Sequence, residues 1–276
     1  MKFSVLMSVY AKEKPEYLCQ SMQSLADQTL RANELVLIED GSISYELSSI
    51  IDEFREKLNI KSVKFEQNCG LAAALNAGLQ NCSHDVIARM DTDDICLPQR
   101  FELQISRLDQ DIDLDIVGCF TTEIDAKGNL GAVRSMPVTH EAIIANMWTC
   151  PFIHPTVVFR RDKILALGGY NQALRRRQDY ELWFRCAKAG FTFANLPESL
   201  LQYRFDRDTH KKQPAKIALD QALIGYKGAS LAGMAHWKRF ACFVPFVRSL
   251  LPSRMQHFAY KILRNFDPRQ NKSGGY

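Results

Sequence analysis

Segments prone to form β-strands alternate with amphipathic stretches along the N-terminal third of the chain. The strand-like segments are residues 3–10, 34–40, 62–67 and 86–91. The stretches between them carry apolar residues at helical spacing, as at Leu18, Met22 and Leu25. Four strand–helix units in succession predict an α/β fold with a mainly parallel central sheet, right-handed crossovers and helices on both faces.

The pattern continues less regularly to about residue 205. Helices are predicted at 97–108, 139–147 and 174–185, and strands at 116–124, 151–161, 191–195 and 200–205. From residue 214 the pattern becomes helical, and Pro245 and Pro252 interrupt it. We therefore expect an α/β domain over residues 1–210 and a helical extension over residues 211–276.

Acidic residues stand where two of the predicted strands end. Asp40 follows the second strand, and Asp91, Asp93 and Asp94 follow the fourth. Parallel strands bring their carboxyl ends to one edge of the sheet, where α/β proteins bind ligands. Because three neighbouring carboxylates repel one another, they favour a hard divalent cation such as Mg2+ or Mn2+, with a nucleotide diphosphate completing its ligands. The alternative is a solvated acidic loop in which Asp94 caps the next helix.

Other candidate residues each allow a structural and a functional interpretation. The small residues from Gly70 to Gly78 permit close helix packing, and the start of this helix can also hold a phosphate. Asp179, at the start of a predicted helix, is either a cap or a general base. His154 precedes a proline and is either a structural hydrogen-bonding residue or a catalytic one. The arginines at 175–177 are either solvated or face a phosphate.

Charge is distributed unevenly along the chain. Residues 1–200 contain 21 Lys and Arg against 27 Asp and Glu, whereas residues 201–276 contain 14 against 4. An anionic partner is expected for this basic tail, either nucleic acid or membrane headgroups. Aromatic side chains alternate with the basic ones over residues 237–264, which favours an anionic membrane surface over nucleic acid. A helical flap that packs on the α/β domain is the alternative.

Composition restricts the compartment and the class of protein. The chain has 276 residues, 46% of them hydrophobic, which is enough for a substantial core. Its eight cysteines form no CxxC pair, as expected in a reducing compartment. No apolar window is long enough to span a bilayer, and the N-terminal run lacks the features of a signal peptide. We expect a cytoplasmic protein, peripheral on the inner face of the plasma membrane.

Six motifs, in order along residues 3–205, resemble those of the family 2 glycosyltransferases. This family contains bacterial enzymes with a GT-A type fold that binds nucleotide-diphospho-sugars. The matching stretches are residues 4–10, 39–42, 68–70 with 76–78, 91–94 with 98–100, 154–156 and 178–183. One departure is Leu75, because many relatives have an arginine there. The chain also lacks the Gln-x-x-Arg-Trp motif of processive synthases, so the resemblance implies transfer of a single sugar per encounter.

The resemblance implies a role for each matching residue. Asp91 is expected to face the ribose and Asp93 to bind the metal, Mg2+ or Mn2+, with Asp94 nearby. Asp179 is expected to be the catalytic base. The uridine is expected to contact Val9, Tyr10 and Asp40. The rest of the nucleotide-sugar is expected to contact Asn68, Gly70, Asn76 and Arg89. The acceptor is expected to contact Trp148 and His154.

The implied function is inverting transfer of a sugar from a UDP-sugar to a hydroxyl of a glycan acceptor. A glycan on a lipid diphosphate, in surface polysaccharide or O-antigen synthesis, would explain the basic aromatic tail. One alternative is a metal-dependent phosphatase or nucleotidyltransferase, but such phosphatases need an aspartate after the first strand, where this chain has Ser8, Val9 and Tyr10. The other is a non-catalytic membrane-binding module, although all the candidate acids are present.

Overall fold

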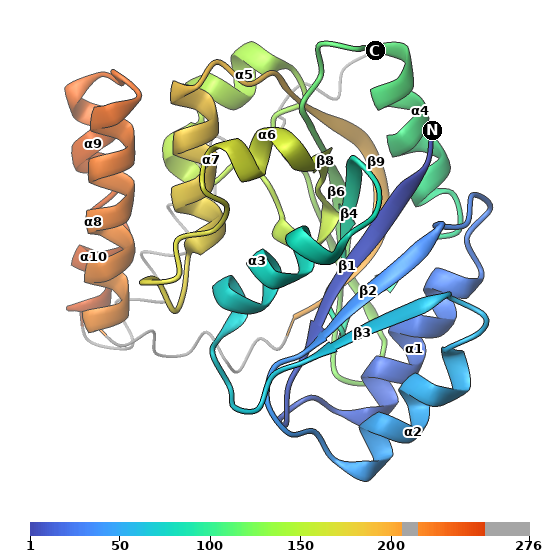
Figure 1. The fold of residues 1–276 in the computed structure, drawn as a ribbon. Helices are drawn as coiled ribbons and strands as arrows, with labels where there is room; N and C mark the ends of the chain where they lie inside the picture. Colours follow the sequence, from blue (N-terminus) through green and yellow to red (C-terminus); the bar gives the residue numbers. More distant parts are fainter. Residues whose placement is uncertain (206–214, 252–276) are drawn as a thin grey trace.

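A computed structural model describes residues 1–205 and 215–251 (Figure 1). The strands are β1 Phe3–Val9, β2 Glu34–Glu39, β3 Ile60–Lys64, β4 Val86–Arg89, β5 Ile95–Cys96, β6 Ile116–Ile124, β7 Leu130–Arg134, β8 Val158–Arg160 and β9 Phe193–Arg204. The α-helices are α1 Pro15–Ala26, α2 Tyr45–Phe54, α3 Leu71–Asn81, α4 Arg100–Gln110, α5 His140–Ala145, α6 Arg161–Ala166, α7 Gln178–Lys188, α8 Ala215–Leu231, α9 His236–Ala241 and α10 Val244–Ser249. Two 3-10 turns are η1 Met147–Thr149 and η2 His154–Thr156.

The strands form one mixed sheet in the order β3-β2-β1-β4-β8-β6-β9-β5, and β7 forms a hairpin with β6. The predicted parallel arrangement is confirmed for β3, β2, β1 and β4. The strand β8 is antiparallel to both its neighbours, β4 and β6, whereas β6 and β9 are parallel. The carboxyl ends of β1, β2 and β4 therefore lie at one edge of the sheet.

Helices cover both faces of the sheet, as the sequence predicts (Figure 1). On one face α1, α2 and α4 bury Leu18, Leu47 and Phe101 in a common core. On the other face α3 and α7 bury Leu75 and Trp183 in a second core. Each helix places apolar residues three or four positions apart toward the strands. The two cores fix the sheet edge that carries the candidate acids.

Several element boundaries differ from the sequence prediction, and the strand predicted at residues 151–161 is reduced to β8 and the preceding turn η2. Two of the differences have local backbone reasons. Residues 191–195 and 200–205 belong to one strand, β9, whose pairing register shifts opposite Cys119, Phe120 and Thr121 of β6. Pro197 lies in this irregular part and has no N–H for the ladder. The helix α7 begins at Gln178 rather than near residue 174, because Arg177 has a left-handed backbone with φ of 61°.

The C-terminal helices pack against the end of the catalytic domain. A Cβ atom added to Gly228 of α8 would lie 2.1 Å from the ring of Phe184 in α7, so the two helices are in very close contact. On α9, Lys238 donates to the carbonyl of Ala145 at 2.7 Å, and the ring of Trp237 lies 5.7 Å from that of Trp148. The expected helical extension is confirmed within the described residues. The domain boundary at residue 210, between this extension and the catalytic domain, stays a prediction.

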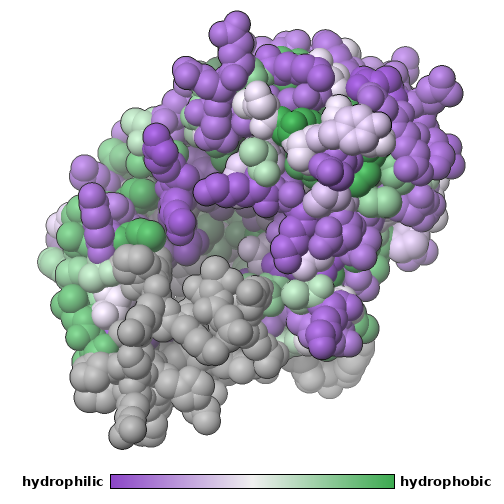
Figure 2. All heavy atoms as spheres, turned by 90° about the horizontal axis from the view of Figure 1, so that it is seen from below, coloured by the Kyte–Doolittle hydropathy of each residue, from purple (hydrophilic) through white to green (hydrophobic). Residues whose placement is uncertain are grey.

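The described helices include none with the length and hydropathy needed to cross a bilayer. Apolar side chains are nevertheless exposed on α9 and α10, and Figure 2 shows hydrophobic surface on the side of the molecule where these helices lie. The exposed residues are Trp237, Phe240, Val244, Val247 and Leu250. Part of the predicted membrane segment, residues 252–264, lies outside the described residues.

Candidate functional site

Asp40 joins the end of β2 to the start of α3. Its carboxylate accepts hydrogen bonds from the amide of Cys69 at 2.7 Å, the amide of Gly70 at 3.0 Å and the side chain of Asn68 at 2.9 Å. Its own amide donates to the carbonyl of Val9 at 2.8 Å. Gly70 has φ of 91°, which favours glycine at the turn before α3. Four residues predicted to contact the nucleotide-sugar are thus brought together, and the contacts themselves stay predictions.

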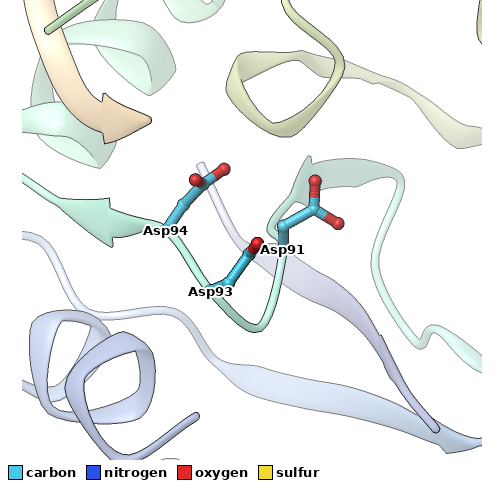
Figure 3. Close-up of side chains that lie close together, drawn as sticks. All are labelled: Asp91, Asp93 and Asp94. Atoms are coloured by element: carbon cyan, nitrogen blue, oxygen red, sulfur yellow. The ribbon is translucent and has the colours of Figure 1, made fainter. Parts of the chain in front are cut away.

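Asp91, Asp93 and Asp94 occupy the tight turn between β4 and β5. Oxygen atoms from the three carboxylates lie within 4.8 Å of one another, and Figure 3 shows the side chains on one side of the turn. The alternative role of Asp94 as a helix cap is wrong, because α4 starts at Arg100 and Gln99 is its N-cap residue. Asp94 is instead buried, and its Oδ1 accepts from the amide of Arg204 at 2.8 Å.

Burial and mutual repulsion disfavour three simultaneous negative charges in this turn. Burial, then the charge of Asp91, raises the pKa of Asp93 to about 6. Burial, then the charges of Asp93 and Asp91, raises the pKa of Asp94 well above its usual range. The Oδ2 atom of Asp94 is also buried with no hydrogen-bond partner among the described residues. A divalent cation would relieve both the repulsion and the unpaired oxygen, so this donor set fits Mg2+ or Mn2+.

Glu13 is an additional acid at the site that the sequence analysis missed. It lies in the loop after β1, hydrogen-bonds to Thr92 and interacts with Asp93 and Asp91. Burial is the main reason that its pKa rises to about 7. Burial, then Glu13 and Asp93, also raises the pKa of Tyr10. The position of Glu13 just after a strand predicted to end at the ligand edge was a signal that could have identified it.

Arg89 is the cation buried beneath these acids. Its side chain is 1% exposed, and one of its terminal nitrogens forms an ion pair with Asp91. Its positive charge also lowers the pKa of His154, and opposes the rise in the pKa of Asp179. A direct contact between Arg89 and a donor diphosphate stays a prediction, and it would require the buried guanidinium to become accessible.

His154 and Tyr170 form a hydrogen-bonded pair next to Arg89. The imidazole Nε2 and the phenol oxygen are 2.9 Å apart. Burial, with help from Arg89, lowers the pKa of His154 well below its usual range, so the imidazole is neutral. The side-chain amide of Asn76 donates to the carbonyl of Tyr170 at 2.8 Å and accepts from its amide at 2.7 Å. Asn76 therefore positions Tyr170, a residue the sequence analysis did not select.

Asp179 lies in the first turn of α7, as predicted, and approaches the same group of residues. Burial raises its pKa, although Arg177, Arg89 and the amides at the start of the helix oppose the rise. Burial is the main reason that the pKa of Tyr170 rises, and the charges of Asp179 and Asp91 add to the rise. The two carboxylates thus act on the same phenol from different elements. Next to Asp179 in α7, Tyr180 donates from its hydroxyl to the carbonyl of Trp148, which brings the candidate acceptor residue to this end of α7.

These contacts link the candidate residues into one continuous site. Asp40 bonds to the end of β1, where Tyr10 interacts with Asp93, and Arg89 connects Asp91 with His154 and Asp179. Acids at the ends of parallel strands and the acid at the start of α7 thus interact with one buried arginine, at the edge of the sheet where α/β proteins bind ligands.

Comparison with known proteins agrees with this geometry. The sequence model of the family described as glycosyl transferase family 2 matches residues 4–180. The chain therefore belongs to this family. The amylovoran biosynthesis glycosyltransferase AmsE of Erwinia amylovora is 43% identical over 213 residues, which are 76% of this chain and 79% of AmsE. An Escherichia coli UDP-Gal:alpha-D-GlcNAc-diphosphoundecaprenol beta-1,3-galactosyltransferase is 33% identical over 271 residues, 96% of this chain and 98% of that protein. The protein is therefore a glycosyltransferase, as expected.

The fold is also found in solved structures. S. aureus TarS 1–349 in complex with UDP-GlcNAc matches with a TM-score of 0.69 at 19% identity, over 96% of this chain and 75% of that one. This chain spans 46% of a longer TarS structure. The predicted GT-A fold with a C-terminal helical region is confirmed. The alternative of a phosphatase or nucleotidyltransferase is not supported, because the family to which the chain belongs is one of glycosyl transferases.

Proposed function

We propose that this protein transfers one sugar from a UDP-sugar to an acceptor hydroxyl with inversion, and that Asp179 is the general base. The observation that carries the proposal is the joint action of Asp91 and Asp179 on Tyr170 and Arg89. Support comes from the fact that the expected ribose contact and the expected base both interact with the same buried pair, Tyr170 and Arg89. For direct displacement, the donor sugar and the acceptor hydroxyl must meet between the residue that binds the ribose and the residue that acts as the base.

In the proposed complex the donor lies along the edge of the sheet. Val9, Tyr10 and Asp40 surround the uracil base, and Asp91 contacts the ribose. The amino end of α3, with Asn68, Gly70 and Asn76 nearby, faces the diphosphate. A Mg2+ or Mn2+ ion held at Asp93 would supply Lewis-acid stabilisation of the departing diphosphate.

The acceptor enters from the side of Trp148 and His154. Asp179 removes the proton from the acceptor hydroxyl while its oxygen attacks the anomeric carbon on the face opposite the diphosphate. The C–O bond to the diphosphate breaks as the new glycosidic bond forms, which inverts the anomeric centre. The neutral imidazole of His154 is suited to hydrogen-bond a sugar hydroxyl without adding charge beside the base.

We infer that the acceptor is a glycan on a lipid diphosphate, in surface polysaccharide or O-antigen synthesis. Support comes from the names of two relatives, one assigned to amylovoran biosynthesis and the other to a diphosphoundecaprenol-linked acceptor. Such an acceptor requires the enzyme to work at a cytoplasmic membrane surface. The exposed apolar residues of α9 and α10, together with Lys238, Arg239 and Arg248, are suited to an anionic leaflet.

The donor site is tested by ligand-dependent stability. UDP with Mn2+ should raise the melting temperature of the wild-type protein, and Asp93→Ala should abolish the part of the shift that needs Mn2+. A panel of UDP-sugars with Mg2+ and Mn2+ then identifies the donor by transfer or hydrolysis. If neither UDP nor any UDP-sugar shifts the melting temperature or reacts, the alternative of a non-catalytic module is favoured.

Membrane docking is tested by flotation with vesicles that contain phosphatidylglycerol. The double variant Val247→Asp, Leu250→Asp should bind these vesicles at least about tenfold more weakly, because two acids replace exposed apolar side chains beside an anionic surface. Leu130→Asp makes the same kind of change at an exposed position of β7 and serves as the control. Equal loss in both variants, or none in the first, would contradict docking through α9 and α10.

A further inference from the structure

Arg204, the last residue of β9, connects this strand to the acidic turn, to the segment after β6 and to α1. Its Nε donates to the carbonyl of Asp93 at 2.8 Å. Its two terminal nitrogens donate to the carbonyl of Asp125, after β6, at 3.1 Å, and to the side chain of Gln20, in α1, at 2.8 Å. Its guanidinium also lies 3.9 Å from the ring centre of Tyr17.

The backbone of Arg204 holds the same turn at a second point. Its amide donates to Oδ1 of Asp94 at 2.8 Å, one residue beyond the carbonyl that its side chain contacts. Two successive residues of the turn are therefore bonded to one residue of β9. Charge-assisted hydrogen bonds at two adjacent positions restrain a turn whose carboxylates repel one another.

We propose that Arg204 is a positioning residue that holds Asp93 and Asp94 in place within the acidic turn. All three side-chain nitrogens of Arg204 bond to the protein itself, so it acts through the turn and does not need to touch the nucleotide. Lysine cannot replace it fully, because one ammonium group cannot reach three acceptors that a planar guanidinium reaches together. The expected effect of Arg204 on metal affinity rests on the proposed function. Its restraint of the turn does not.

The first test measures metal affinity in Arg204→Ala and Arg204→Lys. We expect the Kd for Mn2+ in the presence of UDP to rise about tenfold or more in Arg204→Ala, and less in Arg204→Lys, as for other residues that orient metal ligands. The Kd for UDP in EDTA should stay within about twofold, because Arg204 contacts neither the end of β1 nor that of β2. A general loss of folding would instead weaken both.

Arg160 provides a matched control. It too donates from its side chain to backbone carbonyls, those of Leu114 at 2.9 Å and Ile112 at 3.0 Å. It pairs with Val86 at the start of β4, which places it at the opposite edge of the sheet. Arg160→Ala should lower the melting temperature but leave the Kd for Mn2+ unchanged. An equal loss of Mn2+ affinity in Arg160→Ala would overturn the proposal.

A second measurement decides the proposal without any ligand. Amide hydrogen exchange over residues 92–96 should be at least about tenfold faster in Arg204→Ala than in the wild type, while exchange in β1 stays the same. Unchanged exchange over residues 92–96 would overturn the role of Arg204. If wild-type protein binds no UDP with Mn2+, the proposed donor site fails, and the exchange result still decides whether Arg204 holds the turn.

Discussion

The carboxylate of Asp179 should show its proposed role in the pH dependence of transfer. A base must be ionised, and burial raises the pKa of Asp179, so activity should fall as the pH drops through a value above that of an ordinary aspartate. Asp179→Asn should lower kcat by about 10²–10⁴ and leave the affinity for UDP unchanged. The measurement is the rate of sugar transfer between pH 4 and 9.

Asp162→Asn is the control for this prediction. Asp162 also lies in the first turn of a helix, α6, but its side chain is exposed to solvent. Its replacement should leave both kcat and the pH profile unchanged. An acidic limb that persists in Asp179→Asn would assign the titration to a different group.

Glu13 should oppose folding when it is ionised. Its folded pKa of about 7 lies above its ordinary value of 4.5, so its effect on stability is absent below pH 4.5 and grows as the pH rises toward 7. In EDTA at pH 8, Glu13→Gln should raise the free energy of unfolding by about 1–2 kcal/mol, after allowance for partial solvent screening. The difference should vanish near pH 4.5. Urea denaturation at the two pH values measures it, with exposed Glu16→Gln as the control.

Some residues of the site could be predicted from sequence and others could not. Asp91, Asp93 and Asp94 follow a buried strand directly, so the pattern of apolar and acidic residues identifies them. Tyr170 and Arg204 act through contacts with residues distant in the chain, such as the bond from Arg204 to Asp93, 111 positions away. No local pattern encodes such a contact, because it depends on how the late strands join the sheet.

At the scale of elements, strand–helix alternation predicts the parallel half of the sheet well. The reversed direction of β8 was missed, because a short apolar run has the same pattern in either direction. The late start of α7 was missed too, since the left-handed backbone of Arg177 has no signature in residue type. These two features decide where His154 and Asp179 lie. The sequence therefore identifies the candidate residues better than it predicts their arrangement in space.

The turn after α6 depends on Gly169 more than on Gly168. Both have positive φ, so alanine strains the backbone at either position. A Cβ at Gly169 would also lie 2.4 Å from the side-chain oxygen of Asn76, whereas Gly168 has open space. Gly169→Ala should therefore destabilise the protein by about 1–3 kcal/mol more than Gly168→Ala, by loss of the partly buried hydrogen bonds between Asn76 and Tyr170. Thermal denaturation of the two variants makes the comparison, and equal losses would contradict it.

At the scale of the molecule, α8 joins the C-terminal helices to the catalytic domain. Replacing a glycine inside a helix by alanine ordinarily stabilises the helix by about 0.5–1 kcal/mol. Gly228→Ala should instead lower the melting temperature, because the added methyl group meets the buried ring of Phe184. Calorimetry of the whole protein measures the effect. A rise in melting temperature would show that α8 does not depend on close contact with α7.

The position of β9 has a consequence for biosynthesis. This strand comes last among the described strands, yet it pairs with β5 directly after the acidic turn, at Ile95 and Gln202. During translation the N-terminal strands emerge more than a hundred residues before their partner, and pairing over such a separation is slow. A nascent chain should therefore acquire its affinity for divalent cations late, only after β9 has left the ribosome.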